Sequence, residues 1–207
     1  KTVGTVSPAS DSVTTAMIQS NAVNNAKMAD DAIGVAELSA TGTASSSTFL
    51  RGDNAWASAG GDNTPGFMAY LSSTQTVSND TSTKVVFQAE VYDSDSAYDT
   101  STGRFTVPSG EGGKYLFYIR ISFDSESAGA MDKCSVEFKK NGSGFVEQET
   151  NFTNNPVRKA QIVCPIVLDL SASDYVEVFA LIDSSNSLKF EGGSYKTTFG
   201  GHKLIGV

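Results

Sequence analysis

Histidine, cysteine and tryptophan are scarce in this chain of 207 residues, which has one, two and one of them, respectively. Zinc sites usually draw on several histidines or cysteines, so none is expected here. No Gly-x-Ser-x-Gly elbow, phosphate-binding Gly-Lys-Thr loop or His-Glu-x-x-His helix is present either. The single histidine, His202, falls within the last predicted strand, where we expect a structural role. We therefore expect neither an enzyme nor a cofactor.

Basic residues and long apolar runs are also few. The 15 Lys and Arg residues stand against 23 acidic ones, the net charge is −8, and the basic residues are scattered. Nucleic acid needs clustered basic side chains, so we do not expect it as a partner. No stretch approaches the roughly 18 apolar residues that span a bilayer, so we expect no membrane insertion. No secretory signal is visible, and a chain that starts in mid-pattern at Lys1 is expected to be a fragment.

The two cysteines, Cys134 and Cys164, fall in two predicted strands. Two are too few for a disulfide-dependent scaffold. We predict that both are buried thiols, and a bridge between them is the alternative. Because 39% of the residues are hydrophobic and only 18% are charged, the chain can build a core under a surface of Ser, Thr, Asn and Gly. Such a surface is typical of β-rich adhesive proteins.

The first forty residues contain a ten-residue repeat, aligned as Asp11–Ser20, Asn21–Asp30 and Asp31–Ala40. Its third, sixth and eighth places are apolar: Val13, Val23, Ile33; Ala16, Ala26, Ala36; Ile18, Met28, Leu38. Nothing in a single chain folds back over these places, whereas three chains around one axis would turn each place into a buried layer. We predict a trimeric shaft segment over residues 1–40. A helical hairpin and an alanine-rich linker are the alternatives.

Residues 41–63 are rich in Thr, Ser, Gly and Ala, which predicts a connector. Its large side chains, Phe49, Leu50 and Trp56, are expected to pack at the junction between shaft and head. The tripeptide Arg51-Gly52-Asp53 matches an integrin motif, but three-residue matches are common by chance. We expect a turn built on Gly52.

Residues 64–207 are predicted to form an all-β head domain. Apolar residues alternate in seven segments: Phe67–Leu71, Lys84–Val91, Tyr115–Phe123, Cys134–Phe138, Ala160–Leu170, Tyr175–Ile182 and Phe199–Val207. Turn signals separate them, among them Thr102-Gly103, Asn141-Gly142 and Gly192-Gly193. Many short strands without a helix favour a sandwich or jelly roll.

The strand Tyr115–Phe123 shows how the predicted head would pack. Its odd-numbered residues, Tyr115, Phe117, Ile119, Ile121 and Phe123, would face the core of the sandwich. On the other face, the side of Tyr118 is expected to pack partly against a neighbouring subunit.

Two resemblances cover nearly the whole chain. The run Leu38–Trp56 (LSATGTASSSTFLRGDNAW) resembles the linker before the head domains of phage tail fibres, and the preceding decads are similar to their shaft repeats. The head resembles the globular domain of the complement q-subcomponent and tumour-necrosis-factor-like superfamily. The residues that carry this second resemblance are Val86-Phe87, Tyr98–Pro108, Gly113–Phe117, Lys140–Gly142, Leu168–Val178 and Thr198–Leu204.

The second resemblance implies a jelly roll that trimerises around aromatic and aliphatic residues of each protomer. Two positions depart from the family pattern. Asp174 follows Ser173 where a Gly-Asp pair is usual, and Gly200-Gly201-His202 stands near the C-terminus. The predicted fold is therefore an all-β jelly-roll head after an N-terminal fibrous repeat segment, assembled as a homotrimer.

If the first head strand runs outward, strand parity decides which loops reach the tip of the fibre, where a cell can be met. The predicted tip loops are about Ser72–Thr83, Pro108–Gly113, Asn141–Pro156 and Asp183–Thr197. The loops predicted to face the shaft are Asp93–Thr100, Asp124–Lys133 and Ser171–Asp174.

Two of the tip loops carry aromatic side chains among amides, a mixture that suits sugar recognition, since rings stack on pyranose faces and amides bond hydroxyls. The predicted receptor-binding residues are Phe145, Gln148, Asn151, Phe152, Asn186, Lys189, Phe190 and Tyr195. For each single residue the alternative is a solvated loop whose phenylalanine anchors it to the core. On the shaft side, Asp93, Asp95 and Asp99 form a weak candidate for Ca²⁺, with plain solvated carboxylates as the alternative.

The sequence as a whole predicts a phage tail-fibre tip that trimerises and binds a host surface receptor, preferably a glycan. It would belong to the virion and be assembled in the host cytoplasm. Its partners would be two further copies, upstream tail or fibre proteins, and a host glycan or envelope protein. The alternatives are a structural virion fibre or decoration protein and a polysaccharide-degrading tail enzyme.

Overall fold

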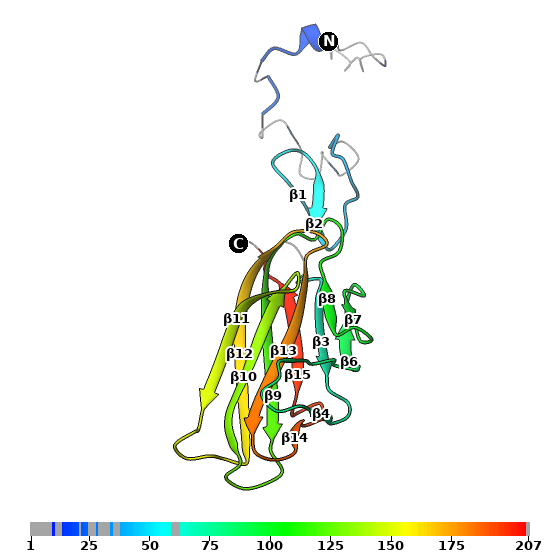
Figure 1. Cartoon of the computed structure of the whole chain (residues 1–207). Helices are drawn as coiled ribbons and strands as arrows, with labels where there is room; N and C mark the ends of the chain where they lie inside the picture. Colours follow the sequence, from blue (N-terminus) through cyan, green and yellow to red (C-terminus); the bar gives the residue numbers. More distant parts are fainter. Residues whose placement is uncertain are drawn as a thin grey trace, which may run out of the picture. The chain divides into compact units, whose positions relative to one another are not determined.

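The structure is a computed structural model that describes residues 10, 14–20, 22–24, 28, 34, 38–58 and 63–205 (Figure 1). The chain forms two compact units, Lys1–Ala59 and Gly60–Val207. The boundary between the two units lies within the predicted connector. The finer division into residues 1–40, 41–63 and 64–207 stays a prediction.

The described part of the first unit contains one 3₁₀ turn, η1 (Thr15–Met17), and a short hairpin of β1 (Thr48–Leu50) and β2 (Trp56–Ser58). No helix among the described residues is long and apolar enough to cross a membrane. Between β1 and β2, the Arg51 amide donates to the Ala55 carbonyl at 2.9 Å, and Arg51 pairs with Asp53 at 3.0 Å. The predicted turn around Gly52 is confirmed.

The repeat prediction falls partly outside the described residues, because Val13, Ala26, Ile33 and Ala36 are not among them. Among the repeat positions that are described, Ile18, Val23 and Met28 carry exposed apolar side chains in the single chain. Exposed layers of this kind are what a shaft of several chains would cover. The trimeric shaft stays a prediction.

The second unit is a sandwich of two antiparallel sheets. The seven-stranded sheet has the order β4 (Gln75–Val77), β14 (Leu188–Phe190), β9 (Gly113–Asp124), β15 (Thr198–Lys203), β3 (Gly66–Tyr70), β6 (Ala89–Asp93), with β12 (Lys159–Leu170) also paired to β9. The six-stranded sheet has the order β11 (Ser143–Asn151), β10 (Met131–Lys140), β13 (Tyr175–Ser184), β8 (Arg104–Thr106), β7 (Tyr98–Asp99), with β5 (Thr83–Lys84) also paired to β13. This architecture confirms the predicted all-β, jelly-roll-like head.

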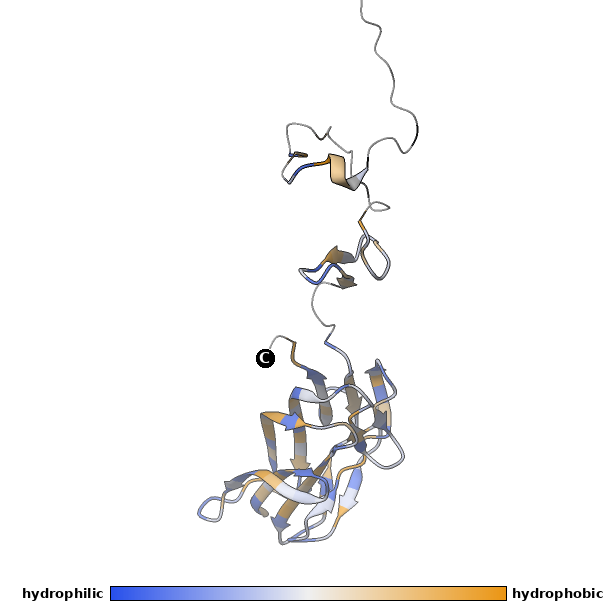
Figure 2. Cartoon of the chain, turned by 90° about the horizontal axis from the view of Figure 1, so that it is seen from above, coloured by the Kyte–Doolittle hydropathy of each residue, from blue (hydrophilic) through white to orange (hydrophobic). Residues whose placement is uncertain are grey.

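The core lies between the two sheets and is built by alternation along the strands, visible as alternating hydropathy in Figure 2. The odd-numbered side chains of β9 from Tyr115 to Phe123 are fully buried, as predicted. At one end of the core the Phe67 ring stacks on Tyr98 and Phe105, with ring centroids 4.9 and 5.0 Å apart. Offset aromatic contacts of this kind add to the energy of simple burial.

Cys134 and Cys164 are both buried and free, so the prediction of two thiols without a bridge is confirmed. Burial raises the pKa of the Cys134 thiol to about 12, and burial also raises the pKa of Cys164. Both side chains therefore act as small apolar core residues.

The sandwich has two distinct ends. The basal end is where the chain enters at Gly66 and leaves after Lys203, and it carries the turns at 108–112, 141–142 and 171–174 (Figure 1). The apical end carries the loops at 125–130, 152–158, 185–187 and 191–197. Backbone bonds join neighbouring loops at each end: Ser173 donates to Val107 at the base, and Ser125 donates to Arg158 at the apex.

Two of the loop placements predicted from strand parity are wrong. Pro108–Gly113 lies at the basal end instead of the tip, and Asp124–Lys133 lies at the apical end instead of facing the shaft. The reason is the two-residue strand β7, which pairs with β8 and turns the chain round once more. Its alternation is too short to be recognised from sequence.

The prediction that Asn141–Pro156 is a single tip loop is also wrong. Asn141 and Gly142 form a tight basal turn with φ of 52° and 80°, and β11 then carries the chain to the apex. β7 had reversed the direction expected for the strands after it. β11 is a second unpredicted strand and reverses the direction again, so the strands after it run as predicted. For that reason Asp183–Thr197 does lie at the apical end, and Ser171–Asp174 at the basal end.

Candidate functional site

The outward face of the seven-stranded sheet has an apolar centre that none of the described residues covers, and we call it the open face. It is formed by the even-numbered residues of β3, β9 and β15, the odd-numbered residues of β12, and Tyr92 of β6. Val163 and Val167 are 55% and 52% exposed there. Its central side chains are Met68, Tyr92, Leu116, Tyr118, Arg120, Val163, Pro165 and Val167.

Tyr118 occupies the middle of the open face because its neighbour on β15 is glycine. A Cβ built on Gly200 would lie 2.5 Å from Cζ and Oη of Tyr118, so only glycine leaves room for the ring. Burial raises the pKa of Tyr118, and the nearby Tyr92 hydroxyl raises it further. The two tyrosines therefore form one aromatic surface across β6, β3, β15 and β9.

The outward face of the six-stranded sheet is different, since its side chains pair with one another. Glu177 accepts from Lys84 at 2.6 Å and from Arg104 at 3.0 Å. The Arg104 guanidinium lies 3.7 Å from the centre of the Tyr175 ring. Burial raises the pKa of Glu177, but the two cations outweigh it and leave the pKa below its ordinary value. A polar, paired surface suits contact with water, whereas a contiguous apolar face suits contact with protein.

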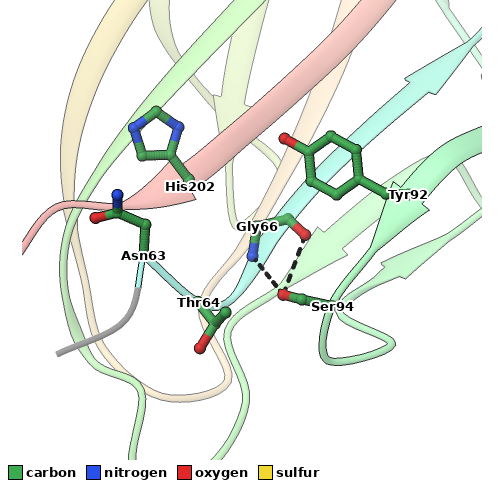
Figure 3. A pocket seen from close by; sticks show the side chains of 6 residues that line it. All are labelled: Asn63, Thr64, Gly66, Tyr92, Ser94 and His202. Atoms are coloured by element: carbon green, nitrogen blue, oxygen red, sulfur yellow. Dashed lines mark hydrogen bonds between the residues drawn. The ribbon is translucent and has the colours of Figure 1, made fainter. Parts of the chain in front are cut away.

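Two hollows lie on the open face. The basal hollow, about 320 Å³ in volume, is shown in Figure 3, where the rings of His202 and Tyr92 stand on either side of Gly66. Its other lining residues are Asn63, Thr64 and Ser94, and the Ser94 hydroxyl accepts from the Gly66 amide at 2.9 Å. His202 lies in β15, so the prediction that it falls in the last strand is confirmed.

The central hollow has a volume of about 310 Å³. It is lined by Met68, Tyr118, Ile119, Arg120, Val163 and Thr198. Arg120 is the charged residue of this group. Its Nε is buried and has no hydrogen-bond partner within the described part of the chain.

The predicted receptor-binding residues do not form one group. Phe145, Gln148 and Asn151 belong to β11, where Phe145 lies beside the basal turn, away from the apex. Phe190 is fully buried in β14, and its ring centroid lies 5.7 Å from that of Phe123. Phe190 therefore cannot contact a receptor. Its prediction as a binding residue is wrong, and the alternative of a phenylalanine that anchors its loop to the core applies instead.

The structure brings Asn151, the last residue of β11, and the remaining predicted residues to the apical end. Tyr195 is 73% exposed in the loop at 191–197, and Asn186 is exposed in the neighbouring turn. Lys189 pairs with Glu126 of a loop that had been predicted to face the shaft. Phe152 is half-buried against the core, and Asn151 accepts from the Thr153 amide at 2.9 Å.

A network of ion pairs that sequence reasoning missed ties the apical loops together. Asp124, at the end of β9, pairs with Arg158 at 3.1 Å and with Lys159 at 3.2 Å. Lys159 and Lys196 both lie 2.9 Å from Glu191. Burial raises the pKa of Asp124, but Arg158, the Glu126 amide and Lys159 lower it to about 2. No sequence signal marks this network, because its members are far apart in the chain.

The three acidic candidates for Ca²⁺ accept hydrogen bonds from groups in their own loops. Asp93 accepts from the backbone amides of Ala97 at 3.1 Å and Tyr98 at 2.9 Å. Asp99 accepts from the Ser101 and Thr102 hydroxyls at 2.6 and 2.8 Å, which lowers its pKa to about 2. Asp95 accepts from the Ser94 hydroxyl. Within the described residues, no three His, Cys, Asp or Glu side chains gather as a group that could hold a metal ion.

Comparison with known proteins gives one family. The sequence profile of the C1q domain matches residues 66–204. Two solved structures that resemble the chain are the globular domain of the zebrafish complement 1qA protein and the Eiger TNF of S. frugiperda. Each shares 17% identity, covers 68% of this chain and gives a TM-score of 0.47, with 97% and 93% of the other chain covered. No curated protein matches the chain.

Proposed function

Because the chain belongs to the C1q domain family, whose domains commonly form trimers, we propose that it is a homotrimeric, non-enzymatic binding module at the tip of a bacteriophage tail fibre. In this proposal the open face joins three copies of the head. The apical end binds a receptor on the host cell surface, with a glycan as the preferred class. The virion is its location after assembly in the host cytoplasm.

The open face is the observation that supports self-association most directly. Leu116, Tyr118, Val163 and Val167 form an apolar surface on long, regular strands, and nothing in the described part of the chain packs over it. A monomer that left this surface in water would forgo the free energy of burying it, roughly 25 cal/mol for each Å². Copies of the same face can bury it in a closed cyclic assembly.

The placement of the two ends supports receptor binding at the apex. Since the chain enters the head at the basal end, a fibre continuing upstream presents the apical end outward. The exposed Tyr195 ring offers a stacking surface, while Asn186 and Asn151 offer amides. The ion pairs of Asp124 and Glu191 hold the apical loops in place, which lowers the entropic penalty of binding.

The phage setting is supported by the sequence of the first unit. Its ten-residue repeats and the linker Leu38–Trp56 resemble shaft segments of tail fibres, and the exposed Ile18, Val23 and Met28 require covering. Upstream tail or fibre proteins would be the further partners. A structural virion protein without host binding is the second candidate, and a polysaccharide-degrading enzyme is the third.

Binding of the full chain to a glycan array and to host-envelope fractions tests the proposal. We expect adsorption that Tyr195→Ala and Asn186→Ala weaken about tenfold or more, the loss of one or two good contacts. Phe145→Ala is the matched control, because Phe145 is 57% exposed but lies near the basal end. A chain that neither adsorbs to host cells nor competes with the phage would contradict receptor binding. Release of reducing sugar from host capsule would contradict the non-enzymatic assignment.

A further inference from the structure

Arg120 lies in the centre of the open face, in surroundings that do not satisfy its charge. Its neighbours across the sheet are Val163 on β12 and Thr198 on β15. Along β9, Tyr118 precedes it and Ser122 follows it on the same face. None of these side chains is ionised at neutral pH, so the guanidinium has no counter-charge among its strand neighbours.

Arg120 also differs from the other described arginines. Arg51, Arg104 and Arg158 each form an ion pair with a carboxylate. No ion pair of Arg120 occurs within the described residues, and its buried Nε lacks a hydrogen bond. A buried donor without an acceptor destabilises the folded chain, and the penalty is larger when the donor is charged.

Three carboxylates in or next to the same sheet are engaged elsewhere. Asp124 binds Arg158 and Lys159, and Glu191 binds Lys159 and Lys196. Asp93, on β6, accepts from backbone amides of its own loop. These three carboxylates are therefore not free to pair with Arg120 in its own copy.

We propose that Arg120 binds a small oxyanion, of the phosphate or sulfate class, inside the interface between copies of the head. This inference rests on the proposed self-association of the open face. The central hollow, with a volume of about 310 Å³, has room for such an ion beside Met68 and Thr198. Association removes water from the hollow and gathers one guanidinium from each copy, so an anion that bridges these cations stabilises the assembly.

The test measures assembly of the full chain by sedimentation in chloride and in inorganic phosphate at equal ionic strength. We expect phosphate to lower the dissociation constant of the wild-type assembly by about tenfold or more, as for one good charge-assisted contact. Arg120→Met, which keeps the length of the side chain without its charge, removes this response, and Arg120→Gln provides a second neutral variant. Lys114→Met is the matched control, because Lys114 is an exposed cation on the same face of β9, and it keeps the response.

The outcomes separate this inference from the proposed function. A chain that is monomeric in every buffer overturns the self-association and the anion site together. An assembly that ignores phosphate and sulfate overturns the anion site alone. If Arg120→Met weakens such an anion-independent assembly, the acceptor belongs to a neighbouring copy and the proposed oxyanion is wrong. An equal loss of response in Lys114→Met also overturns the site, because it shows a general charge effect.

Discussion

Tyr118 and Gly200 lie directly against each other on neighbouring strands of the open face. The approach is so close that a Cβ on Gly200 would stand 2.5 Å from Cζ and Oη of the tyrosine. On the other face of the sheet, Gly201 has the same relationship with the Phe117 ring, whose Cδ1 would be 2.5 Å from an added Cβ. The glycine pair thus lets one strand carry an aromatic ring on each side.

Gly200→Ala is expected to displace the Tyr118 ring and to weaken both the fold and the self-association. Overpacking of this kind costs about 1–3 kcal/mol. Chemical denaturation measures the first effect, and sedimentation measures the second. Gly112→Ala is the control, since an added Cβ there meets nothing closer than 3.4 Å and its φ is not positive. Equal stability of the two variants would contradict the steric reason for glycine at position 200.

Val167→Asp is expected to make the head monomeric without unfolding it. The side chain is 52% exposed in one copy and lies across from Leu116, so a carboxylate there can remain in water, but it would be buried between copies. Burying an unpaired charge in an interface costs several kcal/mol. Light scattering gives the mass, and circular dichroism checks the fold. Phe145→Asp, a similarly exposed position on the other sheet, should leave the mass unchanged.

Ser173→Gly is expected to stabilise the head. Ser173 has a φ of 71° in the basal turn before β13, a conformation that glycine adopts without strain. Relief of such strain is worth about 1 kcal/mol, less the extra entropy that glycine gives the unfolded chain. Ala172→Gly in the same turn, where φ is not positive, should destabilise instead. The midpoint of urea unfolding distinguishes the two variants, and a lower midpoint for Ser173→Gly would contradict the argument.

The stability of the head is expected to fall below about pH 4 through Asp124. The folded pKa of this carboxyl is about 2, below its ordinary value of 3.8, so its contribution is complete above pH 4 and is lost as the pH falls toward 2. Because Arg158 and Lys159 are about half exposed, we expect a contribution of only about 1 kcal/mol. Unfolding measured from pH 6 to pH 2 should show a shallower decline for Asp124→Asn than for the wild type. If the stability of the two proteins declines in parallel as the pH falls, Asp124 is not the source of the acid sensitivity.

The alternation of residues predicted the long strands that bury one face in the core, whereas β11, which has nine mostly exposed residues, was missed because it shows no such alternation. β9 has twelve residues, so the sequence shows which of its faces is buried. The turn between β10 and β11 is recognisable because it consists of Asn141 and Gly142, residue types that favour turns. β7 has two residues and β14 has three, too few for a period to be recognised. Both parity errors and the placement of Phe190 follow from such short strands.

The residues of the candidate surfaces were predictable to different degrees. The alternation along β9 predicts that Tyr118 points outward. The sequence does not show that the Nε of Arg120 lacks a hydrogen-bond acceptor, because this depends on which groups the fold brings near it. Phe190 and Tyr195 stand five positions apart in similar sequence, yet one is buried and the other is exposed. The pairing of the short strand β14 with β4 and β9 places Phe190 in the core, whereas Tyr195 lies in the loop that follows.

The pairing of Gly66 with His202 places the first and last strands of the head side by side, so the chain enters and leaves at a single pole. A domain whose two connections lie together can be inserted into a longer chain, or removed from it, as one unit. Recombination at this point would exchange the whole domain and leave the opposite end of the sandwich unchanged. A circular permutant that joins residues 204 and 66 by a short linker and opens at 128 should therefore fold.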